Sequence, residues 1–156
     1  LYLIHHPWDD NAAMLEMWKT LEGYVEEGVL RSIGVSNFTK EQLDYIIEHG
    51  TIKPAVNQIQ SHPGHWNDEH VAYCQSVGVD VEAWGPLSRT TPESRDALSE
   101  IGKQYNKTWA QVVLRYQIER GVIVIPKSHN KSNQALNLEI FDFTLSDADK
   151  EAIKAL

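Results

Sequence analysis

The chain has 156 residues, of which 42% are hydrophobic and 23% charged, an ordinary composition for a globular protein. Its formal net charge of −8 disfavours binding to nucleic acid or to an anionic membrane surface, because both need clustered Lys and Arg. No apolar run approaches the roughly 18 residues of a membrane span. Cys74 is the only cysteine, so an internal disulfide is excluded and we expect a reducing, cytoplasmic setting.

Five short apolar runs predict β-strands. They consist mainly of apolar, β-favouring residues, which is typical of the buried strands of a parallel sheet. Their starts lie about 24 to 43 residues apart, the size of repeats in which a helix connects parallel strands. In chain order the runs are Leu1–Ile4, Leu30–Val35, Ala55–Ile59, Val79–Trp84 and Val122–Ile125.

The segments between these runs have helical spacing. The first carries an apolar face that consists of Met14, Met17, Trp18, Leu21 and Val25. Three capping-box pairs predict the starts of later helices: Thr39 with Gln42, Thr108 with Gln111, and Ser146 with Asp149. Thr91-Pro92 predicts a further start, with Thr as the capping residue and Pro at the first helical position. The lone Cys74 lies in a helical stretch and is interpreted as a small buried hydrophobe. Strands that alternate with helices predict an α/β fold.

Polar residues near the strand ends favour a (β/α)8 TIM barrel over an open doubly wound sheet. They occur near the carboxyl end of every strand, where the loops of a barrel converge on one site, whereas an open sheet concentrates its ligand contacts at one switch point. The glycine-rich nucleotide loops GxGxxG and GxxxxGK[ST] are both absent. The chain provides only about five of the eight strands. The residues are His5-His6, Ser36-Asn37, Gln58 with Gln60, Trp84-Gly85-Pro86, and Pro126-Lys127-Ser128.

The loop after the last strand is a candidate phosphate site. Barrels often bind phosphate with this loop and the start of a short extra helix. Lys127 offers a positive charge and Ser128 a hydroxyl, while Asn130 is placed to begin a short helix through Leu136. Backbone N–H groups at such a helix start favour an anion. A solvated surface loop is the alternative interpretation of these residues.

Six motifs, in register along the whole chain, resemble the second half of an aldo-keto reductase, from the fourth barrel strand to the last helix. They are LYLIHHP, RSIGVSNF, PAVNQIQSHP, AWGPLS, IPKSHN and FDFTLSDADKEAI. In that family a (β/α)8 barrel binds NADPH and reduces aldehydes and ketones to alcohols. The resemblance therefore implies an oxidoreductase with NADPH as cofactor, NADH as the alternative cofactor, and a small aldehyde or ketone as substrate. It implies no nucleic-acid or membrane partner.

The resemblance also assigns roles to individual residues. His5 matches the active-site histidine that polarises the substrate carbonyl, and His6 and Trp8 are expected to line the substrate pocket. The cofactor contacts are Ser36, Asn37 and Gln58 at the nicotinamide carboxamide, Trp84 on the nicotinamide ring, Gly85 and Leu87 at the pyrophosphate, Lys127 and Ser128 at the 2′-phosphate, and Asn137 at the adenine. Trp84 stands where the family usually has Tyr.

Structural explanations compete with each of these roles. Ser36-Asn37 can be a turn, Gln58 a satisfied core amide, Trp84 plain core, and His5 a hydrogen-bonded buried histidine. Four histidines near strand ends also raise a metal-hydrolase alternative, although HxH and HExxH spacings are missing; they are His5, His6, His62 and His65. Trp66, together with Trp8, suggests an apolar or aromatic substrate pocket.

Departures from the family pattern limit what this chain can do. The family reaction also needs a Tyr, a Lys and an Asp from the first half of the barrel, and no residue here matches them. We therefore expect residues 1–156 to be a single partial barrel domain of a longer, monomeric reductase, inactive by itself. The alternative is a self-associating half-barrel that binds cofactor as a regulatory or structural module. Asn133 replaces a common Arg, and Leu136 a polar adenine contact, so discrimination against NADH should be weakened.

Overall fold

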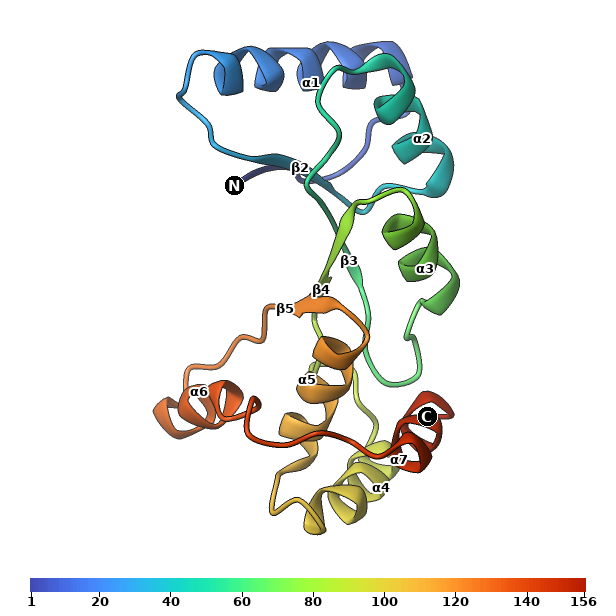
Figure 1. Cartoon of the computed structure of the whole chain (residues 1–156), viewed down its shortest axis with the longest axis vertical. Helices are drawn as coiled ribbons and strands as arrows, with labels where there is room; N and C mark the ends of the chain where they lie inside the picture. Colours follow the sequence, from blue (N-terminus) through green and yellow to red (C-terminus); the bar gives the residue numbers. More distant parts are fainter. The chain divides into compact units, whose positions relative to one another are not determined.

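The computed structural model describes all 156 residues as five strands alternating with seven helices (Figure 1). The strands form one sheet in the order β1-β2-β3-β4-β5, and β2 pairs in parallel with both β1 and β3. This confirms the α/β prediction. The strands are β1 (Tyr2–Ile4), β2 (Ile33–Ser36), β3 (Val56–Gln60), β4 (Asp80–Trp84) and β5 (Val122–Val124). The helices are α1 (Asn11–Glu26), α2 (Lys40–His49), α3 (Asp68–Ser76), α4 (Pro92–Lys103), α5 (Trp109–Glu119), α6 (Lys131–Leu138) and α7 (Asp147–Lys154).

Each predicted strand is present, and the largest difference lies at the start of β2. Strand pairing begins at Ile33, three residues later than the apolar run that starts at Leu30. The N–H groups of Val29 and Leu30 instead donate to the carbonyl of Tyr24, at 2.9 and 3.0 Å, and so finish the turn after α1. No helix of the structure is long and apolar enough to cross a bilayer.

The chain divides into two compact units. The first consists of residues 1–59 and 68–82, and the second of residues 60–67 and 83–156. In the first unit α1 contacts both α2 and β2 (Figure 1). Its core consists of side chains from these elements that are at most 5% exposed, including Met14, Trp18, Leu21, Ile33, Val35, Leu43 and Ile46.

Gly34 allows β1, β2 and β3 to approach one another closely. A Cβ at this position would lie 2.8 Å from the Cδ2 atom of Leu3 and 2.8 Å from the backbone oxygen of Val56. Both atoms belong to neighbouring strands, since Gly34 is paired with Leu3 in the β1–β2 register. Any larger residue would therefore have to push the strands apart.

The buried face of α1 differs from the predicted one by one charged residue. Met17 is 37% exposed, whereas Glu22 is only 5% exposed. The Glu22 carboxylate accepts hydrogen bonds from the backbone N–H groups of Thr51, at 2.6 Å, and of Ile52. It thus satisfies two donors in the segment after α2, which explains why a charged side chain lies in the core.

The second unit is built around α5, which contacts α4, α6, α7 and β5 (Figure 1). Its apolar cluster consists of Trp66, Leu98, Val112, Val113, Tyr116, Leu145 and Ile153. Trp66 donates its indole N–H to the carbonyl of Ile153 at 3.1 Å. Trp66 is therefore a core residue that ties a loop to α7, and not part of a substrate pocket as its place near a strand end suggested.

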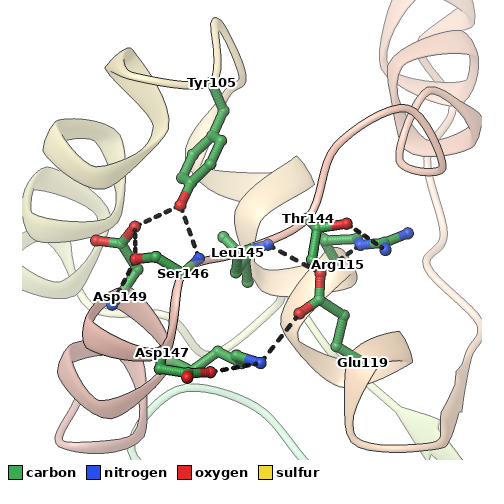
Figure 2. Close-up of polar contacts among 9 residues, drawn as sticks. Tyr105, Arg115, Glu119, Thr144, Leu145, Ser146, Asp147 and Asp149 are labelled. Atoms are coloured by element: carbon green, nitrogen blue, oxygen red, sulfur yellow. Dashed lines mark hydrogen bonds and ion pairs between the residues drawn. The ribbon is translucent and has the colours of Figure 1, made fainter.

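The predicted helix starts are confirmed at Thr39, Thr91 and Thr108, and the first and third form full capping boxes. Ser146 begins α7 as predicted, but without the reciprocal half of the box. The carboxylate of Asp149 instead accepts from the hydroxyls of Ser146, at 2.7 Å, and Tyr105, at 2.5 Å (Figure 2). This contact fixes the start of α7 to the loop that precedes α5.

A second polar contact in the same region holds the segment before α7. The carboxylate of Glu119, on α5, accepts from the Nε of Arg115 at 2.7 Å and from the backbone N–H of Leu145 at 2.9 Å (Figure 2). The side chains of Glu119 and Arg115 are 10% and 15% exposed, so this ion pair is largely shielded from water. It anchors the segment that carries Leu145 into the core.

Candidate functional site

The carboxyl ends of β1, β2 and β3 bring the predicted nicotinamide contacts of the first unit together. Ser36 and Gln58 are directly paired in the β2–β3 register. The Ser36 hydroxyl and the Asn37 backbone N–H both donate to the backbone oxygen of Gln58, each at 2.9 Å. Ser36 is only 2% exposed. Residues that are 22 positions apart in the sequence therefore form one polar group, which we call the amide cluster: Ser36, Asn37 and Gln58.

Asn37 joins this cluster to the end of β1. Its φ of +60° is left-handed, a conformation that Asn tolerates better than most residues. Its Nδ2 atom donates to the backbone oxygen of His5 at 3.2 Å and to the Ser36 hydroxyl at 3.1 Å, and it lies 3.2 Å from Nδ1 of His6. The His5 and His6 rings are stacked, with centroids 4.3 Å apart. The structure thus brings His5 and His6 to the amide cluster.

Asn57 supports the turn in which Asn37 lies. It is fully buried, and its amide donates to the carbonyl of Phe38 at 3.0 Å and accepts from the N–H of Phe38 at 3.3 Å. Phe38 is itself buried, at 1% exposure. The side chain of Asn57 therefore acts on the backbone immediately after Asn37. Asn57 is not among the predicted site residues, and its only signal in the sequence is that it is a polar residue near the start of an apolar strand.

Glu82 is a further residue of the first unit that contacts the amide cluster. The Gln58 side chain donates from Nε2 to Oε1 of Glu82 at 2.5 Å. Glu82 lies in β4 between the buried residues Val81 and Ala83. A charged residue between buried neighbours was the sequence signal that could have drawn attention to it.

The second unit carries the residues predicted at the pyrophosphate. Gly85 follows β4 with a left-handed φ of +61°, and its carbonyl accepts from the hydroxyl of Ser88 at 3.3 Å. Leu87 packs its side chain against the apolar cluster around α5. Any contact of Leu87 with a phosphate would therefore involve its backbone N–H. Trp84, at the end of β4, is half-buried.

The loop after β5 has the features predicted for a phosphate site. Asn130 begins α6 and its side chain accepts from the N–H of Asn133 at 3.0 Å, as expected, and the helix extends two residues beyond Leu136. The Ser128 hydroxyl accepts from the N–H of Asn130 at 3.1 Å. Lys127 is exposed, and its ammonium group pairs with no carboxylate. An unpaired cation three residues before the capping residue of a helix suits an anionic ligand.

Asn137 borders an apolar hollow of the second unit. The hollow has a volume of about 830 Å³ and lies between β5 and α6. Leu138 and Phe141, which also line it, are 74% and 70% exposed. The remaining lining residues are Ile118, Gly121, Val122, Ile123, Val124, Ile125, Pro126, Gln134 and Ile140. Asn137 is half-buried at the edge of this surface.

The structure groups no three His, Cys, Asp or Glu side chains in an arrangement that could hold a metal ion. His62 is buried, and its Nδ1 atom is hydrogen-bonded to the carbonyl oxygen of Pro63 at 2.7 Å. Its Nε2 atom lies 2.8 Å from the amide nitrogen of Gln60. Cys74 is buried in α3 as predicted, and burial raises the pKa of its thiol. Trp8 is 46% exposed, in the loop after β1.

A parallel α/β sheet with polar residues at successive carboxyl ends, and with no glycine-rich dinucleotide loop, is the arrangement found in (β/α)8 barrels. The model of the aldo/keto reductase family matches residues 1–156, so the chain belongs to this family. The fold is accordingly part of a (β/α)8 barrel.

The relatives are longer than this chain. The chain is 40% identical over its whole length to glyoxal reductase of Bacillus subtilis and 35% identical to morphine 6-dehydrogenase of Pseudomonas putida, and it covers 56% and 57% of those proteins. Among solved structures, an aldo/keto reductase of Brucella melitensis has 38% identity and a TM-score of 0.93, with 99% of this chain and 59% of that chain covered. An aldo-keto reductase of Bombyx mori in complex with NADP has 35% identity and a TM-score of 0.90, with 99% and 56% covered. The chain thus spans a little over half the length of these relatives.

Proposed function

We propose that the protein carrying this chain reduces aldehydes or ketones to alcohols with NADPH. The observation that carries the proposal is the amide cluster at the carboxyl ends of β2 and β3, joined by Asn37 to the backbone of His5. A nicotinamide carboxamide has both a donor and an acceptor, and side-chain amides match both. The similar Bombyx mori protein binds NADP, which supports this choice of cofactor. When bound, NADPH would supply the hydride.

We propose cofactor contacts for each unit taken by itself. In the first unit Ser36, Asn37 and Gln58 hold the carboxamide. In the second unit Trp84 covers the nicotinamide ring, while Gly85 and the backbone of Leu87 contact the pyrophosphate. Lys127 and Ser128 bind the 2′-phosphate, because an exposed ammonium and a hydroxyl near a helix start provide charge and donors for it. Asn137 contacts the adenine.

His5 is the residue proposed to act on the substrate. It is exposed, directly after β1, and its backbone is held by Asn37 while its ring is stacked on His6. An imidazole N–H held in this way can donate to a carbonyl oxygen and polarise it. His6 and the partly exposed Trp8 are proposed to form the neighbouring wall of the substrate pocket.

Proton transfer to the carbonyl oxygen needs a general acid, and no residue here matches the Tyr that provides it in the family. A missing general acid costs on the order of 10²- to 10⁴-fold in rate. A polypeptide of these 156 residues alone is therefore expected to bind NADPH but to reduce carbonyls slowly at best. Cofactor binding without turnover in the protein that carries this chain, and not only in these 156 residues, would favour the second candidate function, a cofactor-binding regulatory or structural module.

The experiment that tests the proposal is a titration of the purified protein with NADPH and NADH, followed by quenching of its tryptophan fluorescence. We expect saturable binding of both, with a preference for NADPH well below a thousandfold because Asn133 carries no charge. An Asn37→Leu variant should lose most of the affinity, whereas Asn106→Leu, also at a left-handed Asn, serves as the control for backbone strain. Absence of saturable binding to either cofactor would refute the proposal.

A further inference from the structure

Glu82 is a half-buried carboxylate with no cationic partner. Its side chain accepts a hydrogen bond from a neutral group, the amide of Gln58, at 2.5 Å. It takes part in no ion pair. Partial removal of a carboxylate from water costs free energy that a single hydrogen bond to an amide offsets only in part. Stability alone therefore gives no reason for a carboxylate at this place in β4.

The carboxylate decides which way the Gln58 amide faces. The two ends of a side-chain amide have almost the same shape, and their orientation follows from the hydrogen bonds around them. An ionised carboxylate only accepts hydrogen bonds, so the NH2 group of Gln58 must face Glu82. The Oε1 atom of Gln58 makes no hydrogen bond in the structure. Glu82 therefore leaves Gln58 with an acceptor, and not a donor, to offer to a ligand.

We propose that Glu82 is a positioning residue that makes Gln58 an obligatory acceptor for the NH2 group of the nicotinamide carboxamide. This inference rests on the function proposed above and adds the rule by which the site recognises its ligand. A carboxamide satisfies Gln58, whereas an acetyl group in the same place has no hydrogen to donate. Glu82 acts through Gln58 and makes no contact with the cofactor itself.

The test compares three ligands of the purified protein: NADP+, its 3-acetylpyridine analogue, and 2′,5′-ADP, which has no nicotinamide. Glu82→Met removes the acceptor at similar side-chain length. We expect it to weaken NADP+ binding about 3- to 10-fold, in line with the loss of one hydrogen bond. Binding of the acetylpyridine analogue should change less, and binding of 2′,5′-ADP should stay within about twofold.

Two further variants separate positioning from a structural role. Glu82→Gln can either accept from or donate to Gln58 and no longer fixes its orientation, so it should restore the NADP+ affinity only in part. In a Gln58→Ala background, Glu82→Met should have no further effect, because the residue through which it acts is gone. Thermal unfolding of every variant checks the fold, and Glu82→Ala replaces Glu82→Met if the latter does not fold.

The inference is overturned if Glu82→Met weakens all three ligands equally or none of them, or if its effect persists without Gln58. If the unaltered protein binds 2′,5′-ADP and NADP+, and Glu82→Met binds both with the same affinities, only the positioning role of Glu82 is overturned. An unaltered protein that binds neither ligand would instead refute the proposed function, and the inference with it.

Discussion

Replacement of Glu22 should destabilise the first unit more than replacement of any exposed charged residue on the same helix, α1. In Glu22→Ala the backbone N–H groups of Thr51 and Ile52 lose their shared acceptor, in a place where the side chain is only 5% exposed. A hydrogen bond to a charged group is worth about 1.5 to 3 kcal/mol. Two such bonds to one carboxylate are not independent, so we expect a loss of about 3 kcal/mol in the free energy of unfolding.

The assay is urea unfolding followed by circular dichroism, with Glu16→Ala as the matched control. Glu16 lies on the same helix but is exposed, and its replacement should change the free energy of unfolding by no more than about 0.5 kcal/mol. Glu22→Gln keeps an acceptor without the charge and should fall between the two. If Glu22→Ala lowers the free energy of unfolding by less than about 1 kcal/mol, or by no more than Glu16→Ala does, the carboxylate does not anchor Thr51 and Ile52.

Three other changes have equally definite outcomes. Gly34→Ala should lower the free energy of urea unfolding by about 1 to 3 kcal/mol, because its added Cβ would press against the neighbouring strands. Gly23→Ala, with open space around it in α1, should stabilise the protein. Equal effects of the two changes would contradict the close approach of the strands. Lys127→Gln should weaken NADPH binding about tenfold and NADH binding hardly at all. Lys154→Gln, at an exposed control position, should change neither affinity. An equal loss of NADH affinity in Lys127→Gln would show that Lys127 does not bind the 2′-phosphate. The raised pKa of the Cys74 thiol means that the folded state keeps its proton at a pH where the unfolded chain has lost it, so this thiol should reduce stability as the pH rises above about 8.5. Cys74→Ala should flatten that alkaline decline in melting temperature, and an unchanged decline would show that another group causes it.

Much of the fold could be predicted because the signals are local. The apolar runs at Leu1, Ala55 and Val122 form strands, and Thr39 and Thr108 form full capping boxes, because an apolar run or two residues three positions apart are enough to indicate these elements. Ser146 shows where this stops. Its backbone N–H donates to the hydroxyl of Tyr105 at 2.9 Å and not to Asp149, and Tyr105 lies 41 residues away in the sequence, outside any local pattern.

The candidate site divides in the same way. The sequence by itself determined residue types suited to a nicotinamide cofactor, with amides at Asn37 and Gln58 and a cation at Lys127, each near the carboxyl end of a strand. Only the tertiary structure decided that Glu82 turns the Gln58 amide, that Asn37 holds the backbone of His5, and that Trp66 belongs to the core. The tertiary structure also leaves Met17 exposed and buries Glu22 on the inner face of α1. The physical reason is that hydrogen bonds between strands and loops depend on atoms that the fold brings together, whereas strand and helix signals depend on neighbours along the chain.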